Sequence, residues 1–466
     1  MSSKISTYLG SLTSNQLRKL SLFIHSPYHC SHHPTQHLFN LLSRPPMLSD
    51  PQLYARIYPE SDYDNGRLRV LRANLVKLVK KFLVIEQIEQ DKVRQNMILL
   101  EALESHQLYA EQERVIENGL KEIGEAWSIS SAYTSATLLK AKFDLFLKIG
   151  NRSSSLPFAQ LFDSMDTAYL SDRLKYLCSL ASGKEIIPLN DSLEQKSHWT
   201  HLLSENIKQQ QPIVQIYHQI FLLFSDQSQD YQSVLDLVHQ GEKRIGKGDL
   251  TNIYGFLMNY FNRSYMHGDK AFLPLMLRTY QKMLNRGLIF DQETHSAHHF
   301  KNICMLGARL EEFDWTEQFI ESHQDRLPQE VRIGLYHYCH GLIAFARGSF
   351  STAKKHLLKA DFLDAHYRAT HNLLLIRVYY LSEDDRPFAN LCHTLNQFTR
   401  RNKKLGQTYK DSVLNFIGFV RRLQSLRTGI PAVGSHQALL IEISQCSPLM
   451  DKQWLIDELQ KISPTL

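Results

Sequence analysis

Hydrophobic positions recur along nearly the whole chain with the period of an α-helix. The clearest segment carries large apolar side chains at gaps of 3, 4, 3, 4 and 3 residues, at Leu68, Leu71, Leu75, Leu78, Phe82 and Ile85. This spacing places all six on one helix face, and Asp64 or Asn65 is suited to cap the helix start. The only short β-like run, at residues 185–189, reads as a linker. The pattern therefore predicts an all-α protein.

Four segments rich in Pro, Gly, Ser or Asn interrupt the helical pattern, at residues 43–46, 151–157, 188–191 and 428–434. A chain of 466 residues is too long for one compact core and is expected to divide into several parts. We predict four parts. They are a basic helical part at 1–95, a middle helical part at 96–200, a helical array at 201–428 and two closing helices at 435–466.

The predicted array contains weak internal repetition that is clearest over residues 338–363. There a helix with Gly341 is followed by a Gly348–Phe350 turn and by a second helix with Ala353, Leu357 and Ala360. This segment resembles the tetratricopeptide repeat in its small residue, its Gly-aromatic turn and its Ala-x3-large-x2-Ala helix. Degenerate copies lie at residues 254–284, 304–327 and 372–398, with turns about 36–45 residues apart against about 34 in an ideal repeat. The resemblance implies an α-solenoid of antiparallel helical hairpins.

A second resemblance, spread over most of the chain, is to a group of uncharacterised bacterial helical-repeat proteins. Four segments carry it, at residues 23–28, 68–82, 313–320 and 415–419. In that group Ser-Pro-Tyr is usually followed by Phe-Asn, whereas here His29 and Cys30 follow it. The group has no established activity, so the resemblance implies an architecture and no functional residue.

Composition supports the helical interpretation and excludes several classes of protein. The chain has 20 Gly and 15 Pro, fewer than the roughly 7% and 5% of average usage. None of its six cysteines lies within four residues of another, which argues against a zinc ribbon or a disulfide scaffold. No apolar run approaches the roughly 18–20 residues that span a bilayer. We expect a reduced, soluble, cytoplasmic protein.

Three motifs could carry chemistry, and we expect each to be structural. The histidine-rich segment 25–37 offers metal ligands, but Pro27 and Pro34 interrupt it. A second histidine group, His295, His298 and His299, is expected to pack or to form a polar helix face. Residues 241–248 approach a phosphate-binding loop but have Gly248 where that loop needs Ser or Thr. We therefore predict no cofactor, no metal and no enzymatic activity.

Positive charge is concentrated in two clusters, although the formal net charge of the whole chain is only +6. Residues 1–100 carry a net charge of +6 and residues 396–427 a net charge of +7. The first cluster lies on the polar side of the 68–82 helix. Its members are Arg67, Arg69, Arg72, Lys77, Lys80 and Lys81. From the second cluster we single out Arg400, Arg401, Lys403 and Lys404. Such clusters can neutralise phosphates, although a solvated helix surface explains them as well.

These observations predict a non-catalytic scaffold or adaptor that binds a protein or peptide partner on its helical array. Side chains from the first helices of the hairpins would face the partner, and the candidates are Tyr336, His337, His340 and Arg377. The alternative is a nucleic-acid-associated helical protein that uses residues 67–81 and 400–427. The sequence leaves the identity of the partner and the oligomeric state open.

Overall fold

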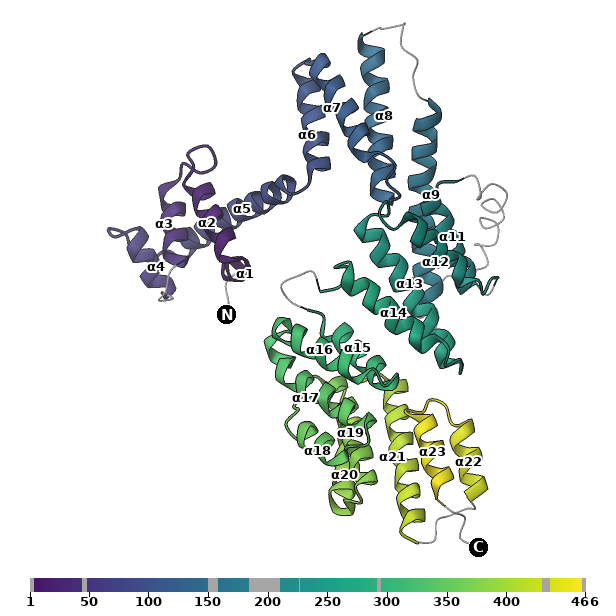
Figure 1. The fold of residues 1–466 in the computed structure, drawn as a ribbon. Coiled ribbons are helices and arrows are strands. Elements are labelled where there is room, and N and C mark those ends of the chain that lie inside the picture. Colours follow the sequence, from purple (N-terminus) through teal and green to yellow (C-terminus); the bar gives the residue numbers. More distant parts are fainter. Residues whose placement is uncertain are drawn as a thin grey trace. The chain divides into compact units, whose positions relative to one another are not determined.

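The computed structural model describes residues 4–43, 48–149, 158–183, 210–225, 227–290, 295–429 and 436–462. Within these ranges all regular secondary structure is helical, which confirms the all-α prediction (Figure 1). No helix in these ranges is long and apolar enough to cross a membrane. Most of the predicted linker residues lie outside the described residues.

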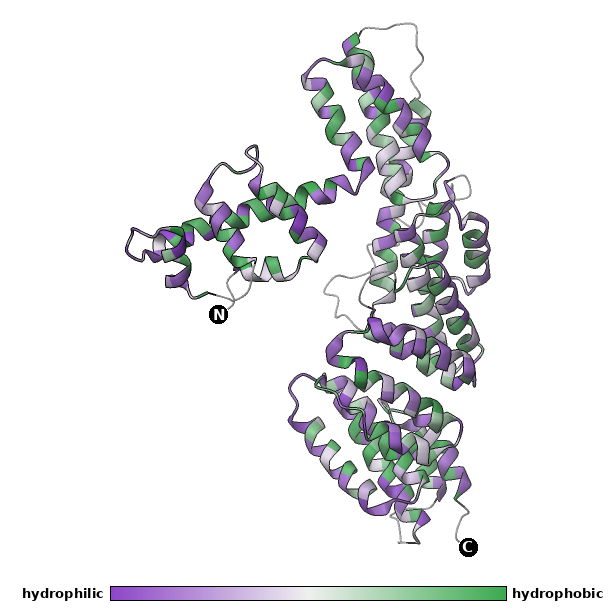
Figure 2. Cartoon of the chain, turned by 60° about the vertical axis from the view of Figure 1, so that its left-hand side comes forward, coloured by the Kyte–Doolittle hydropathy of each residue, from purple (hydrophilic) through white to green (hydrophobic). Residues whose placement is uncertain are grey.

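The chain separates into two compact units, residues 1–168 and 169–466. The predicted boundaries near residues 95, 200 and 428 stay predictions, because residue 200 lies outside the described ranges and nothing tests the other two. The helices of both units carry hydrophobic as well as hydrophilic residues (Figure 2).

The first unit begins with four short helices that contact one long helix, α5 (Asn65–Glu89). The four are α1 (Lys4–Gly10), α2 (Ser14–His25), α3 (His33–Leu42) and α4 (Asp50–Ile57). One hydrophobic core joins all five helices, with buried side chains that include Leu20, Phe39 and Tyr54. Each short helix therefore buries its apolar face against the same partner.

Helix α5 confirms the predicted cap and alters the predicted register. The carboxylate of Asp64 accepts a hydrogen bond from the backbone N–H of Arg67 at 3.1 Å. The buried positions follow gaps of 3, 4, 4 and 3 residues, at Leu68, Leu71, Leu75, Val79 and Phe82. Leu78, which the sequence pattern placed in this row, is only half-buried. A straight helix has a period of 3.6 residues, so a strict 3.5-residue row rotates by about 20° per heptad, and at this one step Val79 faces the core in place of Leu78.

Three further helices follow in the first unit, α6 (Lys92–Ser105), α7 (Tyr109–Ile123) and α8 (Ile129–Ile149). They pack in sequence order around a smaller core of Leu100, Ile116, Leu138 and Leu145. Helix α9 (Phe158–Ser182) begins in this unit and ends in the second.

The second unit continues with helices that pack mostly on their neighbours in the chain. Alternate helices of this unit also contact one another. The contacting pairs are α11–α13, α15–α17, α17–α19 and α19–α21. The described helices are α11 (Pro212–Phe224), α12 (Tyr231–Gly241), α13 (Lys247–Met266), α14 (Phe272–Asn285), α15 (Ala297–Arg309), α16 (Phe313–His323), α17 (Gln329–Ala346), α18 (Phe350–Leu357), α19 (Ala365–Leu381), α20 (Asp385–Arg401), α21 (Gln407–Arg427), α22 (His436–Gln445) and α23 (Lys452–Lys461).

The end of α14 has a backbone closure at Gly287 that five turns within helical hairpins share. In each, the residue two positions beyond the helix end has a positive φ of 56° to 104°, at Gln107, Gly268, Glu311, Gly348 and Glu383. The next N–H then donates to the carbonyl five residues earlier, as from Ser349 to Ala344 at 2.8 Å. This is the Schellman closure, which satisfies carbonyls at the helix end. The last four of these positions are 43, 37 and 35 residues apart.

The hairpin of α17 and α18 shows why small residues recur in it. A Cβ atom on Gly341 would lie 2.8 Å from Leu357 Cδ2, so a side chain there would force the two helices apart. Ala353 is fully buried at the same contact. The second helix is shorter than the repeat pattern suggests, because it ends at Leu357 and Ala360 is buried beyond its end.

Candidate functional site

A pocket of about 420 Å³ opens in the second unit between α14 and α16. Helix α14 supplies Gln281, Leu284 and Asn285. Helix α16 supplies the other lining residues, Trp315, Gln318, Phe319, Ser322 and His323. Both helices pack on α15, which sets the distance between them.

One wall of the pocket is aromatic. Trp315, Phe319 and His323 follow one another at intervals of four residues and therefore lie on one face of α16. The rings of Trp315 and Phe319 stack with centroids 5.8 Å apart, and those of Phe319 and His323 stack at 4.6 Å. Behind them, Phe319 contacts the fully buried ring of Phe300 at 5.2 Å. The wall is thus backed by core and cannot easily rotate away.

Apart from Leu284, the other lining side chains are polar but carry no full charge. They are the amides of Gln281, Asn285 and Gln318 and the hydroxyl of Ser322. The Ser322 hydroxyl donates to the backbone carbonyl of Gln318 at 2.6 Å. An amide side chain has both a donor and an acceptor and so matches the hydrogen-bonding groups of a peptide backbone. The pocket can therefore hold an apolar group and satisfy the neutral polar atoms around it.

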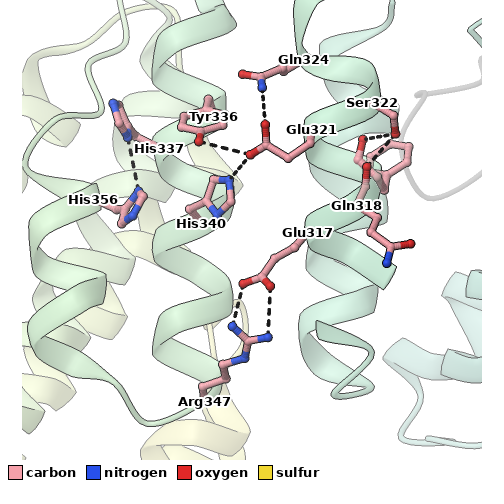
Figure 3. Close-up of polar contacts among 11 residues, drawn as sticks. Glu317, Gln318, Glu321, Ser322, Gln324, Tyr336, His337, His340, Arg347 and His356 are labelled. Atoms are coloured by element: carbon pink, nitrogen blue, oxygen red, sulfur yellow. Dashed lines mark hydrogen bonds and ion pairs between the residues drawn. The ribbon is translucent and has the colours of Figure 1, made fainter. Parts of the chain in front are cut away.

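The opposite face of α16 forms a polar network with α17 (Figure 3). Glu321 Oε1 accepts from the hydroxyl of Tyr336 at 3.2 Å and lies 3.3 Å from Nε2 of His340. Gln324 Nε2 donates to the other carboxylate oxygen at 2.7 Å. About one turn earlier on α16, the guanidinium of Arg347 donates to Glu317 at 2.6 Å and to Asp314 at 3.2 Å. These bonds hold α16 in a defined rotation about its axis.

Three histidines gather on α17 and α18 beside this network. The Nδ1 atoms of His337 and His356 lie 3.3 Å apart, so one ring donates and the other accepts. The ring of His340 lies 5.2 Å from that of His356. Burial lowers the pKa of His337, and Lys359 and His340 lower it further. Burial also lowers the pKa of His356, with smaller contributions from His340, His337 and Lys359.

The structure brings together three of the four predicted partner-facing residues. Tyr336, His337 and His340 are half-buried neighbours on α17. Arg377 is elsewhere, on α19, where its side chain is only 14% exposed and lies 3.4 Å from a carboxylate oxygen of Asp451. Its guanidinium also lies over the rings of Phe345 and Trp454, at 5.0 and 5.9 Å. Arg377 thus connects α19 to the closing helices.

The histidine motifs occupy structural positions. Helix α2 ends at His25 and α3 begins at His33, so the segment between them is a turn. His295 is buried before the start of α15 and stacks on Phe290 at 4.3 Å. Burial lowers the pKa of His295 to about 4, helped by His323 and Arg326. Among the residues that the structure describes, no group of three or more His, Cys, Asp or Glu side chains could hold a metal ion.

The other two histidines of that motif, His298 and His299, contact Asn302 and Tyr280 respectively. The glycine-rich segment 241–248 joins α12 to α13, with Gly246 at the N-cap of α13. A helix therefore precedes it, where a phosphate-binding loop would need a strand.

The first basic cluster is partly used inside its own unit. Arg72 donates two hydrogen bonds to Asp50, at 2.6 and 2.8 Å. The guanidinium of Arg67 lies 3.8 Å from the centroid of the Tyr58 ring, and Lys81 lies 6.0 Å from that of Tyr28. Three members of the cluster remain exposed on α5 with no ion pair among the described residues, and these are Arg69, Lys77 and Lys80.

Several cations of the second basic region, residues 400–427, bind groups of the protein itself, and the exposed ones that remain lie at the end of α20 and in the turn after it. Arg422 pairs with Glu442, and Arg427 donates to the carbonyl of Tyr380. Arg400 donates to Asn396 at 2.8 Å. The exposed cations that remain near it are Arg401, Lys403 and Lys404.

Sequence reasoning missed the pocket. Its residues are separated by about 30 positions in the chain, and only their aromatic spacing on one helix was visible in the sequence. Trp315 and Phe319 lie in a segment whose helical nature was predicted, but the same spacing is typical of core residues. The partner of Tyr336 and His340, Glu321, was missed for the same reason.

Comparisons with known proteins add no identification. No family model, no curated protein and no solved structure matches the chain. The likeness to the tetratricopeptide repeat and to the bacterial helical-repeat group therefore stays a resemblance of sequence.

Proposed function

We propose that this protein is a non-catalytic scaffold that holds a short peptide segment of a partner protein in the pocket between α14 and α16. The pocket would belong to a tetratricopeptide-like array of helical hairpins in the second unit. Such arrays present extended surfaces to partners because each hairpin contacts mainly its neighbours.

The helix contacts support an array. The first helices of successive hairpins touch, as α15 touches α17 and α17 touches α19, while each also packs on its own second helix. The shared turn closure recurs at intervals that approach the period of the resembling repeat. A second independent feature is the close helix pair at Gly341 and Ala353.

The observation that carries the proposal is the composition of the pocket. Its aromatic wall and Leu284 provide apolar surface for one large side chain, and about 420 Å³ leaves room for adjoining backbone. The three amides offer donors and acceptors for that backbone. Because no Lys or Arg lines it, the pocket is unsuited to bind phosphates directly.

The test is selection of random heptapeptides displayed on phage against the full chain, followed by calorimetric measurement of binding by the selected peptides. Trp315→Ser removes the wall, and Gln318→Arg places a charge at the rim. We expect either change to weaken binding at least tenfold. Leu358→Ser is the matched control, because Leu358 is 62% exposed and lies outside the pocket. Failure to select any peptide, or peptides indifferent to both changes, would contradict the proposal.

A second candidate function rests on the exposed cations of α5. Arg69, Lys77 and Lys80 lie on one face of this helix beside Val70 and Val84, which are 61% and 58% exposed. We propose nucleic acid as the alternative partner of this face. Its binding would weaken steeply with salt, with a log–log slope of about −0.9 per duplex phosphate neutralised. A slope near zero in a fluorescence-anisotropy titration of duplex DNA would exclude it.

A further inference from the structure

Helix α9 carries an exposed apolar stripe along nearly its whole length. Six large hydrophobic side chains of this helix are 36% to 61% exposed, and they follow one another at gaps of 4, 3, 4, 7 and 4 residues. This spacing puts all six on one helix face. Among the helices that the structure describes, no other exposes as many large hydrophobic side chains. The six are Phe158, Phe162, Met165, Tyr169, Tyr176 and Leu180.

The opposite side of α9 is buried, so the stripe is held facing outward. Thr167, Ser171, Leu174 and Cys178 are each at most 5% exposed, and their gaps of 4, 3 and 4 residues align them on one face. This face lies two residues out of phase with the stripe, which corresponds to about 200° around the helix. A contiguous row of exposed aromatic side chains marks a surface that binds another molecule.

One flank of the stripe carries two opposite charges, Asp166 and Arg173. They are seven residues apart and therefore lie on the same side of the helix. Asp166 is exposed, and no ion pair within the described residues involves it. The guanidinium of Arg173 donates to the hydroxyl of Tyr169 at 2.6 Å, which holds it beside the stripe. Asp172 lies on the other flank. The two charges thus stand on either side of Tyr169.

We propose that two copies of this chain associate through α9, with the two helices antiparallel and their stripes in contact. A twofold axis near Tyr169 would place Asp166 of each copy opposite Arg173 of the other, so that two equivalent ion pairs form. The same axis brings the two ends of the stripe together, since Phe158 and Leu180 each lie eleven residues from Tyr169. A parallel pair would leave Asp166 and Arg173 about 10 Å apart along the helix axes.

Charge complementarity favours a second copy as the partner of the stripe. In a twofold association, each residue of the surface meets another residue of the same surface, so the surface must be complementary to itself. The flank of α9 meets this demand because its acidic and basic groups stand on either side of the middle of the stripe. The aromatic side chains would provide most of the affinity, and the ion pairs would fix the orientation. The contact uses neither α14 nor α16, so it is independent of the peptide pocket.

The first experiment measures the mass of the full chain by sedimentation equilibrium over a range of concentrations. We expect a reversible dimer. Phe162→Asp places a charge in the middle of the apolar contact and should weaken the dimer at least tenfold. Ile333→Asp is the matched control, because Ile333 is 69% exposed on α17 and lies outside α9. Circular dichroism verifies that both variants keep the helical fold.

A charge exchange then tests the antiparallel orientation. Asp166→Arg makes all four facing groups positive, and Arg173→Asp makes all four negative, so either variant alone should dimerise about four- to twentyfold more weakly. An equimolar mixture of the two variants restores both ion pairs and should associate as tightly as the unaltered chain. Glu113→Arg makes the same charge change at an exposed position on α7 and should change neither result. At 1 M salt, where the Debye length is about 3 Å, these differences should shrink strongly.

Three results would overturn the proposal. A chain that stays monomeric at every concentration would assign the stripe to a partner of another kind. A dimer that Phe162→Asp leaves intact would place the interface away from α9. A mixture of Asp166→Arg with Arg173→Asp that associates no more tightly than either variant alone would exclude the antiparallel pairing. Recovery of the dimer in that mixture would support it, because only a contact between two copies can restore the exchanged pairs.

Discussion

Two regions of this protein distribute their hydrophobic cores differently. In residues 4–89, four short helices share one core around the single helix α5. From α15 to α21, by contrast, each helix packs mainly on the next one or two, so that the core is divided among successive hairpins. The core of residues 4–89 thus depends on the single helix α5, whereas the packing from α15 to α21 depends on many similar contacts between neighbouring helices. Damage to one residue should therefore spread across the first region and stay local in the second.

The largest expected effect is the loss of a central side chain of α5. Leu75 is fully buried at the middle of the shared core. Leu75→Ala should lower the free energy of unfolding by about 2–5 kcal/mol, because it leaves a cavity that five helices border. Hydrogen exchange should show faster opening in α1 through α5 together. Leu22→Ala, at a position that is 66% exposed, is the control and should change little.

Overpacking one hairpin should have a smaller and more local effect. Gly341→Leu, or Ala353→Leu, forces α17 away from α18 and should cost about 1–3 kcal/mol. Gly418→Leu is the matched control, because a Cβ atom there meets nothing within 4 Å. Exchange should quicken in α17 and α18 and stay unchanged in α11 through α13. An equal loss of protection across the whole second unit would contradict the division of its core among hairpins.

Acid should destabilise the second unit by a smaller amount. Histidines whose pKa burial lowers, among them His218, His337, His356 and His371, lie in the second unit. Unfolding restores their ordinary pKa near 6.5, so the unfolded chain binds more protons below that pH and stability is lost as the pH falls. Thermal unfolding between pH 8 and 5 should show this decline. The double variant His337→Gln, His356→Gln should decline less, and an identical profile would contradict the assignment.

The smallest effect concerns the turns. Glu311 and Glu383 have positive φ values of 59° and 58°, which cost a non-glycine residue about 1–2 kcal/mol. Replacing either with glycine should raise stability by about 0.5–1 kcal/mol, after allowance for the greater freedom of unfolded glycine. Thr394→Gly, at an exposed position inside α20, should instead destabilise by a similar amount. Urea unfolding measures all three, and a loss at Glu311 and Glu383 would contradict the role of the turn.

The helical class followed from the sequence because periodicity is a local property. Asp64 was predicted as a candidate cap of α5. Four of the six predicted core positions of that helix are buried, and the other two, Leu78 and Ile85, are half-buried. The choice between Leu78 and Val79 could not be made, since it depends on how α1 through α4 surround the helix. The end of α18 at Leu357 was also missed, because the repeat pattern places Ala360 on the same helix.

The candidate site was less predictable because it is built from residues of two helices. Tyr336, His337 and His340 were singled out from their position on a first helix, yet nothing local identifies Glu321 as the residue that Tyr336 and His340 contact. Arg377 was also singled out from its place on the first helix of a predicted hairpin. Only the fold shows that Trp454 and Asp451 lie against its side chain. Trp315 carries the pocket wall, but an aromatic residue at helical spacing usually indicates a core.

The Schellman closures place few demands on the sequence of the turns that contain them. Each is made by backbone N–H and carbonyl groups, and residues as different as Gln107, Gly268 and Glu383 occupy its left-handed position. The turn therefore imposes few requirements on side-chain identity. A whole hairpin could be exchanged, or residues grafted at its turn, as long as the faces toward the adjacent helices are kept. These turns therefore tolerate a change of side chain, whereas the buried residues of α1 through α5 share one core and constrain one another.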